Sequence, residues 1–200
     1  MLKNKISGLF LIAIGITIPI YNNYYIAKKT KDNNEQVTVY LNKTMNRIPE
    51  NITKEEEKIE QNKGNNYIAV LEIPKIKLKR GLVNIDSKYN DIKYNIAIIK
   101  GSSMPDTVGS NLVLAAHNGS SNVSFFKNLD KLGINTEIYL YYKGYKYIYS
   151  LEDIKTVAKK GIITITRDTS RNTISLITCK TDSDTEQVIY LAYLIDKEAY

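Results

Sequence analysis

One cysteine and one histidine are the residues of this chain best suited to nucleophilic chemistry, and each occurs only once in its 200 residues. A thiolate is a strong nucleophile, and an imidazole beside it can favour ionisation and carry protons. Cys179 and His117 are far apart in sequence, but the partners of such a pair meet in space. The simpler alternative is an inert buried thiol and a histidine that merely ends a strand.

Both residues come at the end of an apolar stretch. Residues 111–116 precede His117, residues 173–178 precede Cys179, and both runs have the composition of a strand. A rigid sheet can present the side chains at its strand ends to a groove, which is how a nucleophile and its base are held within reach. The two contexts therefore favour a Cys–His dyad at one edge of a sheet.

Two polar residues adjoin this pair. Asn118 directly follows His117, where it could form a turn, orient the imidazole or contact substrate. Thr178 precedes Cys179 and is expected to point to the opposite face of its strand, because side chains alternate along a strand. We therefore treat Thr178 as a supporting residue.

The composition limits the other kinds of site. A single cysteine excludes an internal disulfide, and a zinc site of Cys and His would need three or four such ligands. Four carboxylates, namely Glu72, Asp182, Asp184 and Glu186, could suggest a calcium loop, but their spacing fits no EF-hand, and a solvated acidic loop is favoured. We expect no metal and no cofactor.

Charge argues against a nucleic-acid partner. The chain has 28 basic and 21 acidic residues, a formal net charge of +7. Nearly all of the excess is lysine spread along the chain, and arginine, the better reader of bases and phosphates, is scarce. A solvated basic surface is the favoured interpretation.

The N-terminal segment resembles an export signal in its order of charge and apolarity. Lys3 and Lys5 precede a mostly apolar run over residues 6–21, and interfacial tyrosines follow at Tyr24 and Tyr25. The run is shorter than the roughly 20 residues of a typical span. We expect residues 1–27 to be an uncleaved signal anchor that crosses the cell membrane once, with a cleaved signal peptide as the alternative.

Residues 28–66 are polar and predict an extracytoplasmic tether, with a short exposed helix over residues 53–60. Beyond residue 66, short β-rich runs alternate with turn residues. Lys143 and Gly144 separate two of these runs as a hairpin would, and Pro74 should end the first. A helix is expected over residues 124–132. The candidate strands are residues 67–73, 96–99, 112–116, 137–142, 145–151, 162–166, 173–178 and 188–195.

These motifs, taken together, resemble the sortase family of bacterial surface enzymes. The likeness rests on Leu-Ala-Ala-His-Asn ending at Asn118, on the Phe-Phe-x-x-Leu-x-x-Leu pattern after it, and on Leu-Ile-Thr-Cys ending at Cys179. Residues 69–76 are also similar to the first strand of that family. The resemblance implies a mainly β fold for residues 67–200: a closed antiparallel or mixed barrel of about eight strands with a few short helices.

The resemblance also implies a transpeptidase. Cys179 would attack a backbone carbonyl in a C-terminal sorting signal of the LPXTG type and form a thioacyl enzyme. An amine acceptor, such as a cell-wall precursor or a pilin, would then resolve it, with His117 moving the protons. The implied location is the cell membrane, with the catalytic domain outside the cytoplasm.

This sequence departs from the family at one position. The family has an arginine at the start of the strand after the catalytic cysteine, and Gln187 occupies the matching place here. Glutamine can donate a hydrogen bond to an oxyanion but carries no charge, and Arg171 lies too far along an extended strand to replace it. Either Gln187 is the polar donor, which we favour, or the enzyme is weakened, and Arg167 could also return from a loop.

Two alternatives to transpeptidation remain open. Water instead of an amine could resolve the acyl enzyme, which would make the chain a cysteine peptidase. A homologue that binds sorting peptides without catalysis is the other, and Gln187 is the reason to consider it.

Overall fold

The computed structural model describes residues 2–45 and 67–200. Contacts divide the chain into two compact units, Met1–Glu35 and Gln36–Tyr200. The second unit contains every strand of the described residues and both residues of the predicted dyad.

One long helix, α1 (Leu2–Met45), contains the apolar N-terminal run and continues through the polar residues that follow it as far as Met45. Within the described residues, no helix combines the length and the apolarity needed to cross a membrane. The short helix expected over residues 53–60 lies outside the described residues.

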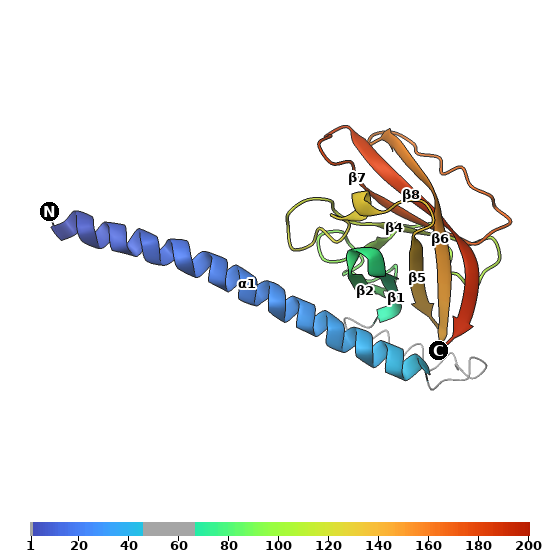
Figure 1. Ribbon diagram of the computed structural model, residues 1–200, viewed down its shortest axis with the longest axis horizontal. Helices are drawn as coiled ribbons and strands as arrows, with labels where there is room; N and C mark the ends of the chain where they lie inside the picture. The colour runs from blue at the N-terminus through green and yellow to red at the C-terminus, as the bar shows by residue number, and fades with distance from the viewer. Residues whose placement is uncertain (1, 46–66) are drawn as a thin grey trace. The chain divides into compact units, whose positions relative to one another are not determined.

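Eight strands form a single sheet that curls into a nearly closed barrel (Figure 1). Two short 3-10 helices, η2 (Pro74–Ile76) and η3 (Leu129–Lys131), interrupt them. This architecture confirms the predicted mainly β barrel. In chain order the strands are β1 (Tyr67–Ile73), β2 (Leu78–Val83), β3 (Ala97–Ile98), β4 (Asn111–Ala115), β5 (Glu137–Tyr142), β6 (Tyr145–Ala158), β7 (Thr173–Cys179) and β8 (Glu186–Ala199).

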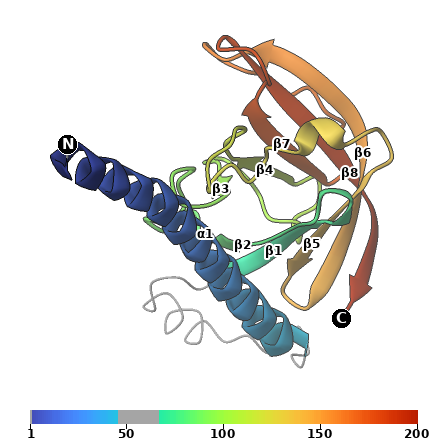
Figure 2. The ribbon, with the colours of Figure 1, turned by 60° about the vertical axis from the view of Figure 1, so that its left-hand side comes forward.

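The strand order is β2-β1-β5-β6-β8-β7-β4-β3, and β4 and β7 are the one parallel pair among the described strands. Figure 2 shows β4, β7 and β8 beside one another. At the seam between β2 and β3, the Asn95 side chain donates to the Gly81 carbonyl at 2.9 Å and accepts from Arg80 Nε at 2.7 Å. Side-chain hydrogen bonds therefore bridge the ends of the sheet.

Alternation along the strands separates the core from the outer face. On β4 and β7 the core residues are Leu112, Leu114, Ile174 and Leu176, all of them fully buried. The residues between them, such as Val113, face the other side of the sheet. His117 and Cys179 continue the outer series, because they follow its odd-numbered positions.

The prediction of a strand over residues 162–166 is wrong. These residues lie in a loop that connects β6 to β7, which run in the same direction on either side of β8 (Figure 1). The loop must therefore cross β8, which prevents it from joining the sheet edge to edge. Ile163 and Ile165 are half-buried whereas Ile162 is fully exposed, so burial alternates along this segment without strand pairing.

The prediction of a helix over residues 124–132 is also wrong. Its one helical part is the short 3-10 helix η3 near the end of this range. The backbone bonds here join residues three apart, as in Lys127 N to Ser124 O and Leu129 N to Phe126 O. The Phe126 amide donates instead to the His117 carbonyl at 3.1 Å, which removes it from any helical ladder. The segment is thus a series of tight turns that ties back to the end of β4.

The last turns of α1 belong to the same compact unit as the barrel. The Tyr40 hydroxyl donates to the Ile68 carbonyl of β1 at 2.7 Å, and Val37 is buried. The Thr44 and Tyr200 hydroxyls are 2.6 Å apart, so the helix also contacts the C-terminal residue. Burial raises the pKa of the Tyr40 phenol, which keeps it a neutral donor.

Candidate active site

The parallel register of β4 and β7 places His117 beside Cys179. Pairing runs from Asn111 with Thr173 to Ala115 with Ile177, and two more residues along each strand lead to His117 and Cys179. Neighbouring strands are about 4.8 Å apart, and residues paired in register project from the same face. The fold therefore brings together the two residues that the sequence marked as a possible dyad.

Two side-chain hydrogen bonds brace this pair beyond the last rung of the ladder. Thr178 Oγ1 donates to the Ala116 carbonyl at 2.8 Å, and Asn118 Nδ2 donates to the Cys179 carbonyl at 3.0 Å. Asn118 thus supplies with its side chain the donor that a longer β4 would have supplied with its backbone. The bonds join β4 to β7 on both sides of the dyad and hold His117 and Cys179 in register.

The Thr178 hydroxyl and the Nδ2 group of Asn118 are both used in hydrogen bonds within the protein. Thr178 is buried on the core face, opposite Cys179, as strand alternation predicts. Asn118 also donates to Thr181 Oγ1 at 3.0 Å, so its amide bridges the turn after His117 to the loop after Cys179. Both residues therefore tie the segments around His117 and Cys179 to each other.

The backbone of His117 is fixed from the other direction as well. Its carbonyl accepts from the amide of Phe126, which is fully buried in the core. The imidazole therefore extends from a backbone anchored to the core through Phe126 and to β7 through Asn118. Both His117 and Cys179 remain half-buried, which leaves a reacting atom access to them.

Gln187 stands on the other side of Cys179. It pairs with Cys179 across β7 and β8, and the next pair is hydrogen-bonded through Lys180 N and Glu186 O at 3.1 Å. Cys179 and Gln187 are consequently a non-hydrogen-bonded pair, the type whose side chains approach most closely, with Cα atoms about 4.5 Å apart. Cys179 and Gln187 therefore adjoin on β7 and β8, and His117 follows the end of β4, the strand on the other side of β7.

Arg167 and Arg171 are engaged at the opposite end of these strands. Arg167 donates to the Gly109 carbonyl at 2.9 Å, before β4 begins, whereas His117 follows its end, about 26 Å away along an extended strand. Arg171 pairs with Glu152 at 2.6 Å and stacks on Tyr193, near the start of β7. Neither guanidinium is available to the dyad.

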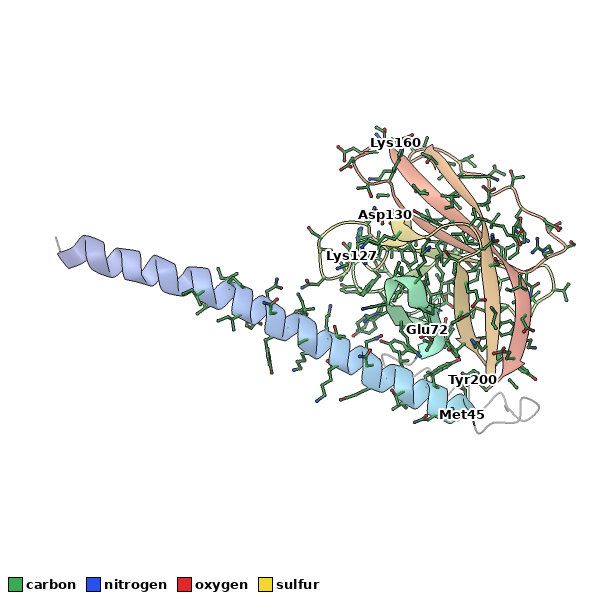
Figure 3. The ribbon with its side chains drawn as sticks, viewed as in Figure 1. Met45, Glu72, Lys127, Asp130, Lys160 and Tyr200 are labelled. Atoms are coloured by element: carbon green, nitrogen blue, oxygen red, sulfur yellow. The ribbon has the colours of Figure 1, made fainter. Side chains whose placement is uncertain are left out.

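The outer face of β4 and β7 presents an apolar surface next to His117 and Cys179. Val113, Ala115 and Ile177 are half-exposed there, in line with His117 and Cys179. The loop from β6 to β7 begins beside the turn after β7, where Lys159 N donates to the Thr185 carbonyl at 2.8 Å. Lys160, labelled in Figure 3, marks this start of the loop. The apolar surface of Val113, Ala115 and Ile177 suits an extended peptide with apolar side chains.

One acidic residue near the site, Glu186, forms an ion pair. Lys180 binds Glu186 at 2.7 Å, and this lysine lowers the pKa of the Glu186 carboxyl. Glu72 lies elsewhere, bound to Lys79 and to the Tyr141 hydroxyl. Across the described part of the chain, no three His, Cys, Asp or Glu side chains gather closely enough to hold a metal ion.

Sequence reasoning missed two groups close to the dyad. The Phe126 amide donates to the His117 carbonyl and Thr181 accepts from Asn118, yet no motif in the sequence singles out either group. Arg80 and Asn95 at the barrel seam were also missed, because contacts between β2 and β3 depend on barrel closure rather than on local pattern.

Comparisons with known proteins agree with this fold. The family model of the sortase domain matches residues 71–195, more than half of the chain. Comparison with curated proteins gave no match.

Among solved structures, a sortase D5 transpeptidase from Clostridium perfringens is 23% identical with a TM-score of 0.56, covering 78% of this chain and 98% of its own. Sortase C-1 from Actinomyces oris is 18% identical with a TM-score of 0.59, covering 86% and 98%. Listeria monocytogenes sortase A is 18% identical with a TM-score of 0.57, covering 68% and 92%. With the family model matched over most of the barrel, the chain belongs to the sortase family of cysteine transpeptidases.

Proposed function

We propose that this chain cleaves a C-terminal sorting signal of the LPXTG type and joins the new carboxyl end to an amine, with Cys179 as nucleophile and His117 as proton carrier. The observation that carries this proposal is the register of β4 and β7, which brings the one thiol and the one imidazole of the chain side by side. Their bracing by Thr178 and Asn118 supports it.

The first half-reaction begins with attack by the Cys179 thiolate on the scissile carbonyl carbon. The new C–S bond forms as the carbonyl electrons move to oxygen, and the oxyanion then expels the amine of the downstream peptide. His117, as the imidazolium, donates a proton to that amine. The products are a thioacyl enzyme and a free downstream peptide.

The second half-reaction reverses these roles. The acceptor nitrogen forms a bond to the thioester carbon, the C–S bond breaks, and the thiolate of Cys179 is regenerated. The proton lost by the amine passes to His117, which restores the imidazolium. Thiolate and imidazolium are thus consumed and renewed together in each cycle.

Gln187 would donate to the oxyanion from the side of Cys179 opposite His117, which its pairing with Cys179 supports. Among the residues that the structure describes, its side chain makes one hydrogen bond, from Nε2 to the Ala158 carbonyl. This bond is long at 3.4 Å, so the amide can turn toward a substrate at little cost. A neutral donor stabilises an oxyanion less than the guanidinium of the family pattern. We therefore expect acylation to be slower than in an enzyme that has an arginine at this position.

We further propose that the enzyme acts at the cell surface on sorting signals of surface proteins, with a cell-wall precursor or a pilin as acceptor. Support for a membrane anchor in residues 1–27 comes from the sequence alone, where lysines precede an apolar run. Membrane fractionation of cells that express the full chain, beside a deletion of residues 2–21, tests this part separately.

Product analysis tests the proposal. The full chain is incubated with LPXTG-like peptides, with and without an added amine, beside Cys179→Ala and His117→Ala. We expect an amide-linked product only with amine, and neither variant should form it. Release of acid alone, at the same rate with and without amine, would assign a peptidase instead. Peptide binding without any turnover would assign a binding module.

A further inference from the structure

The β7–β8 turn (residues 180–185) connects the strand that ends at Cys179 to the strand that carries Gln187. Lys180 directly follows Cys179, and Glu186 directly precedes Gln187. These two charged residues form the next pair beyond Cys179 and Gln187, joined by the bond from Lys180 N to the Glu186 carbonyl at 3.1 Å. The spacing between Cys179 and Gln187 therefore depends on how the turn closes at this pair.

The closing pair of this hairpin has an incomplete set of backbone bonds. In a regular antiparallel pair of this type, the two residues exchange both N–H to carbonyl bonds. Here the Glu186 amide donates to Ser183 Oγ at 3.2 Å, and the Lys180 carbonyl accepts from Ser183 N at 3.4 Å. Bonds to Ser183 thus replace one of the two ties, so the backbone holds β7 to β8 less firmly here than at a complete pair.

An ion pair supplies a second tie at the same place. Lys180 Nζ lies 2.7 Å from Glu186 Oε2, and each side chain is 42% exposed. Because side chains alternate along a strand, this pair lies on the face of the hairpin opposite Cys179 and Gln187. A partly exposed ion pair is weak compared with the stability of a fold, but it is strong enough to bias the closure of one turn.

The rest of the turn is held by other contacts and carries a backbone cost. Asp182 adopts a left-handed conformation with φ of 60°, which costs free energy for a residue with a Cβ. Thr181 Oγ1 accepts from Asn118 Nδ2 at 3.0 Å, and the Thr185 carbonyl accepts from Lys159 N at 2.8 Å. These bonds hold the outer part of the turn, whereas the ion pair holds its base, next to the reacting thiol.

We propose that Lys180 and Glu186 are positioning residues whose ion pair holds Gln187 at the distance from Cys179 at which its amide can donate to the oxyanion. The inference rests on the proposed function and extends it to a pair on the opposite face of the hairpin. A neutral hydrogen bond weakens steeply with distance and angle, whereas the attraction of a charge falls off slowly. A glutamine donor therefore needs a firmer hold than the arginine of the family pattern.

Single-turnover acylation of the full chain by an LPXTG-like peptide tests the inference, with the limiting rate and the half-saturating peptide concentration measured separately. Lys180→Met and Glu186→Gln each break the ion pair, and the double variant Lys180→Glu with Glu186→Lys restores it with the charges exchanged. The control is Asp106→Asn, which breaks an ion pair with Lys143 of nearly the same exposure, 42% and 40%. Asp106 precedes β4 and lies at the end of that strand opposite His117.

Breaking the ion pair should lower the limiting acylation rate about threefold to fivefold, the scale of a partly exposed ion pair. The half-saturating concentration should stay unchanged, because an oxyanion donor acts on the transition state and not on the bound peptide. The exchanged pair should regain most of the rate, and Asp106→Asn should acylate like wild type. Equal rates in all variants, or an exchanged pair as slow as the single variants, overturns the inference.

A double-mutant cycle shows whether the ion pair acts through Gln187. In a Gln187→Ala background, Lys180→Met should slow acylation no further, and an undiminished loss there overturns the inference. Amide exchange across residues 186–188 should quicken in Lys180→Met and return to the wild-type rate in the exchanged pair; unchanged exchange also overturns it. Normal acylation that ignores the ion pair refutes the inference alone, whereas absence of any acyl enzyme in wild type refutes the proposed function and the inference with it.

Discussion

The brace formed by Asn118 is the feature of the site whose removal has the most predictable effect. Replacing Asn118 with alanine deletes the bonds to the Cys179 carbonyl and to Thr181 Oγ1, both 3.0 Å long. A typical hydrogen bond contributes about 0.5–1.5 kcal/mol net, and the bond to Thr181 is exposed and belongs at the lower end. The expected loss of unfolding free energy is about 1–2 kcal/mol.

For a chain of this size, that loss lowers the melting temperature by about 2–8 °C. The effect on activity should be larger than the effect on stability, because the dyad depends on the two strand ends keeping their register. We expect the rate of thioacyl formation to fall by about tenfold or more, at a temperature where the variant is fully folded.

Two further variants separate the contributions of the two Asn118 hydrogen bonds to stability and to acylation. Thr181→Val removes only the exposed bond and should cost a few tenths of a kcal/mol, with acylation nearly unchanged. Asn118→Asp replaces the donor with a carboxylate that faces the Cys179 carbonyl and should be worse than alanine. Chemical unfolding and single-turnover acylation give both quantities. An Asn118→Ala protein that unfolds and acylates like wild type would refute the bracing role.

Other perturbations address the oxyanion, the loop and the helix. Gln187→Arg should raise the acylation rate about tenfold or more, measured by single turnover, and a slower variant would show that the glutamine is itself required. Arg167→Gln removes the bond to the Gly109 carbonyl and should speed amide exchange across residues 159–171 while Cys179 alkylates as before; unchanged exchange would contradict this. Tyr40→Phe should cost about 1 kcal/mol of unfolding free energy, while Tyr24→Phe, at an exposed position, should cost nothing measurable; equal stability of the two variants would contradict the contact between Tyr40 and β1.

Much of the barrel could be predicted because alternation and turn chemistry act locally. Lys143 and Gly144 form the turn between β5 and β6, as the hairpin predicted from them requires. The two apolar runs that end at His117 and Cys179 became β4 and β7 for the same reason.

The errors have a common origin in competition for backbone donors and space. Phe125, Phe126 and Leu129 have helical spacing, but the Phe126 amide is used by the His117 carbonyl, so tight turns replace the helix. Residues 162–166 have strand composition, yet they must cross β8 to reach β7 and find no edge to pair with. In both cases a contact distant in sequence overrides the local preference.

The support of the dyad could not be predicted for a related reason. The role of Asn118 depends on β4 ending one rung before β7, and the contact between Arg80 and Asn95 depends on barrel closure. A single sequence carries no local signal for either relation.

Cys179 and His117 are expected to act as one catalytic unit at the ends of β7 and β4. Intact-mass analysis of the full chain after rapid mixing with an LPXTG-like peptide, followed by peptide mapping, tests it most directly. We expect an increment equal to the N-terminal part of the peptide, mapped to Cys179, absent from Cys179→Ala and strongly reduced in His117→Ala. An adduct that forms at the wild-type rate in His117→Ala, or that maps to another residue, would contradict the joint role of Cys179 and His117.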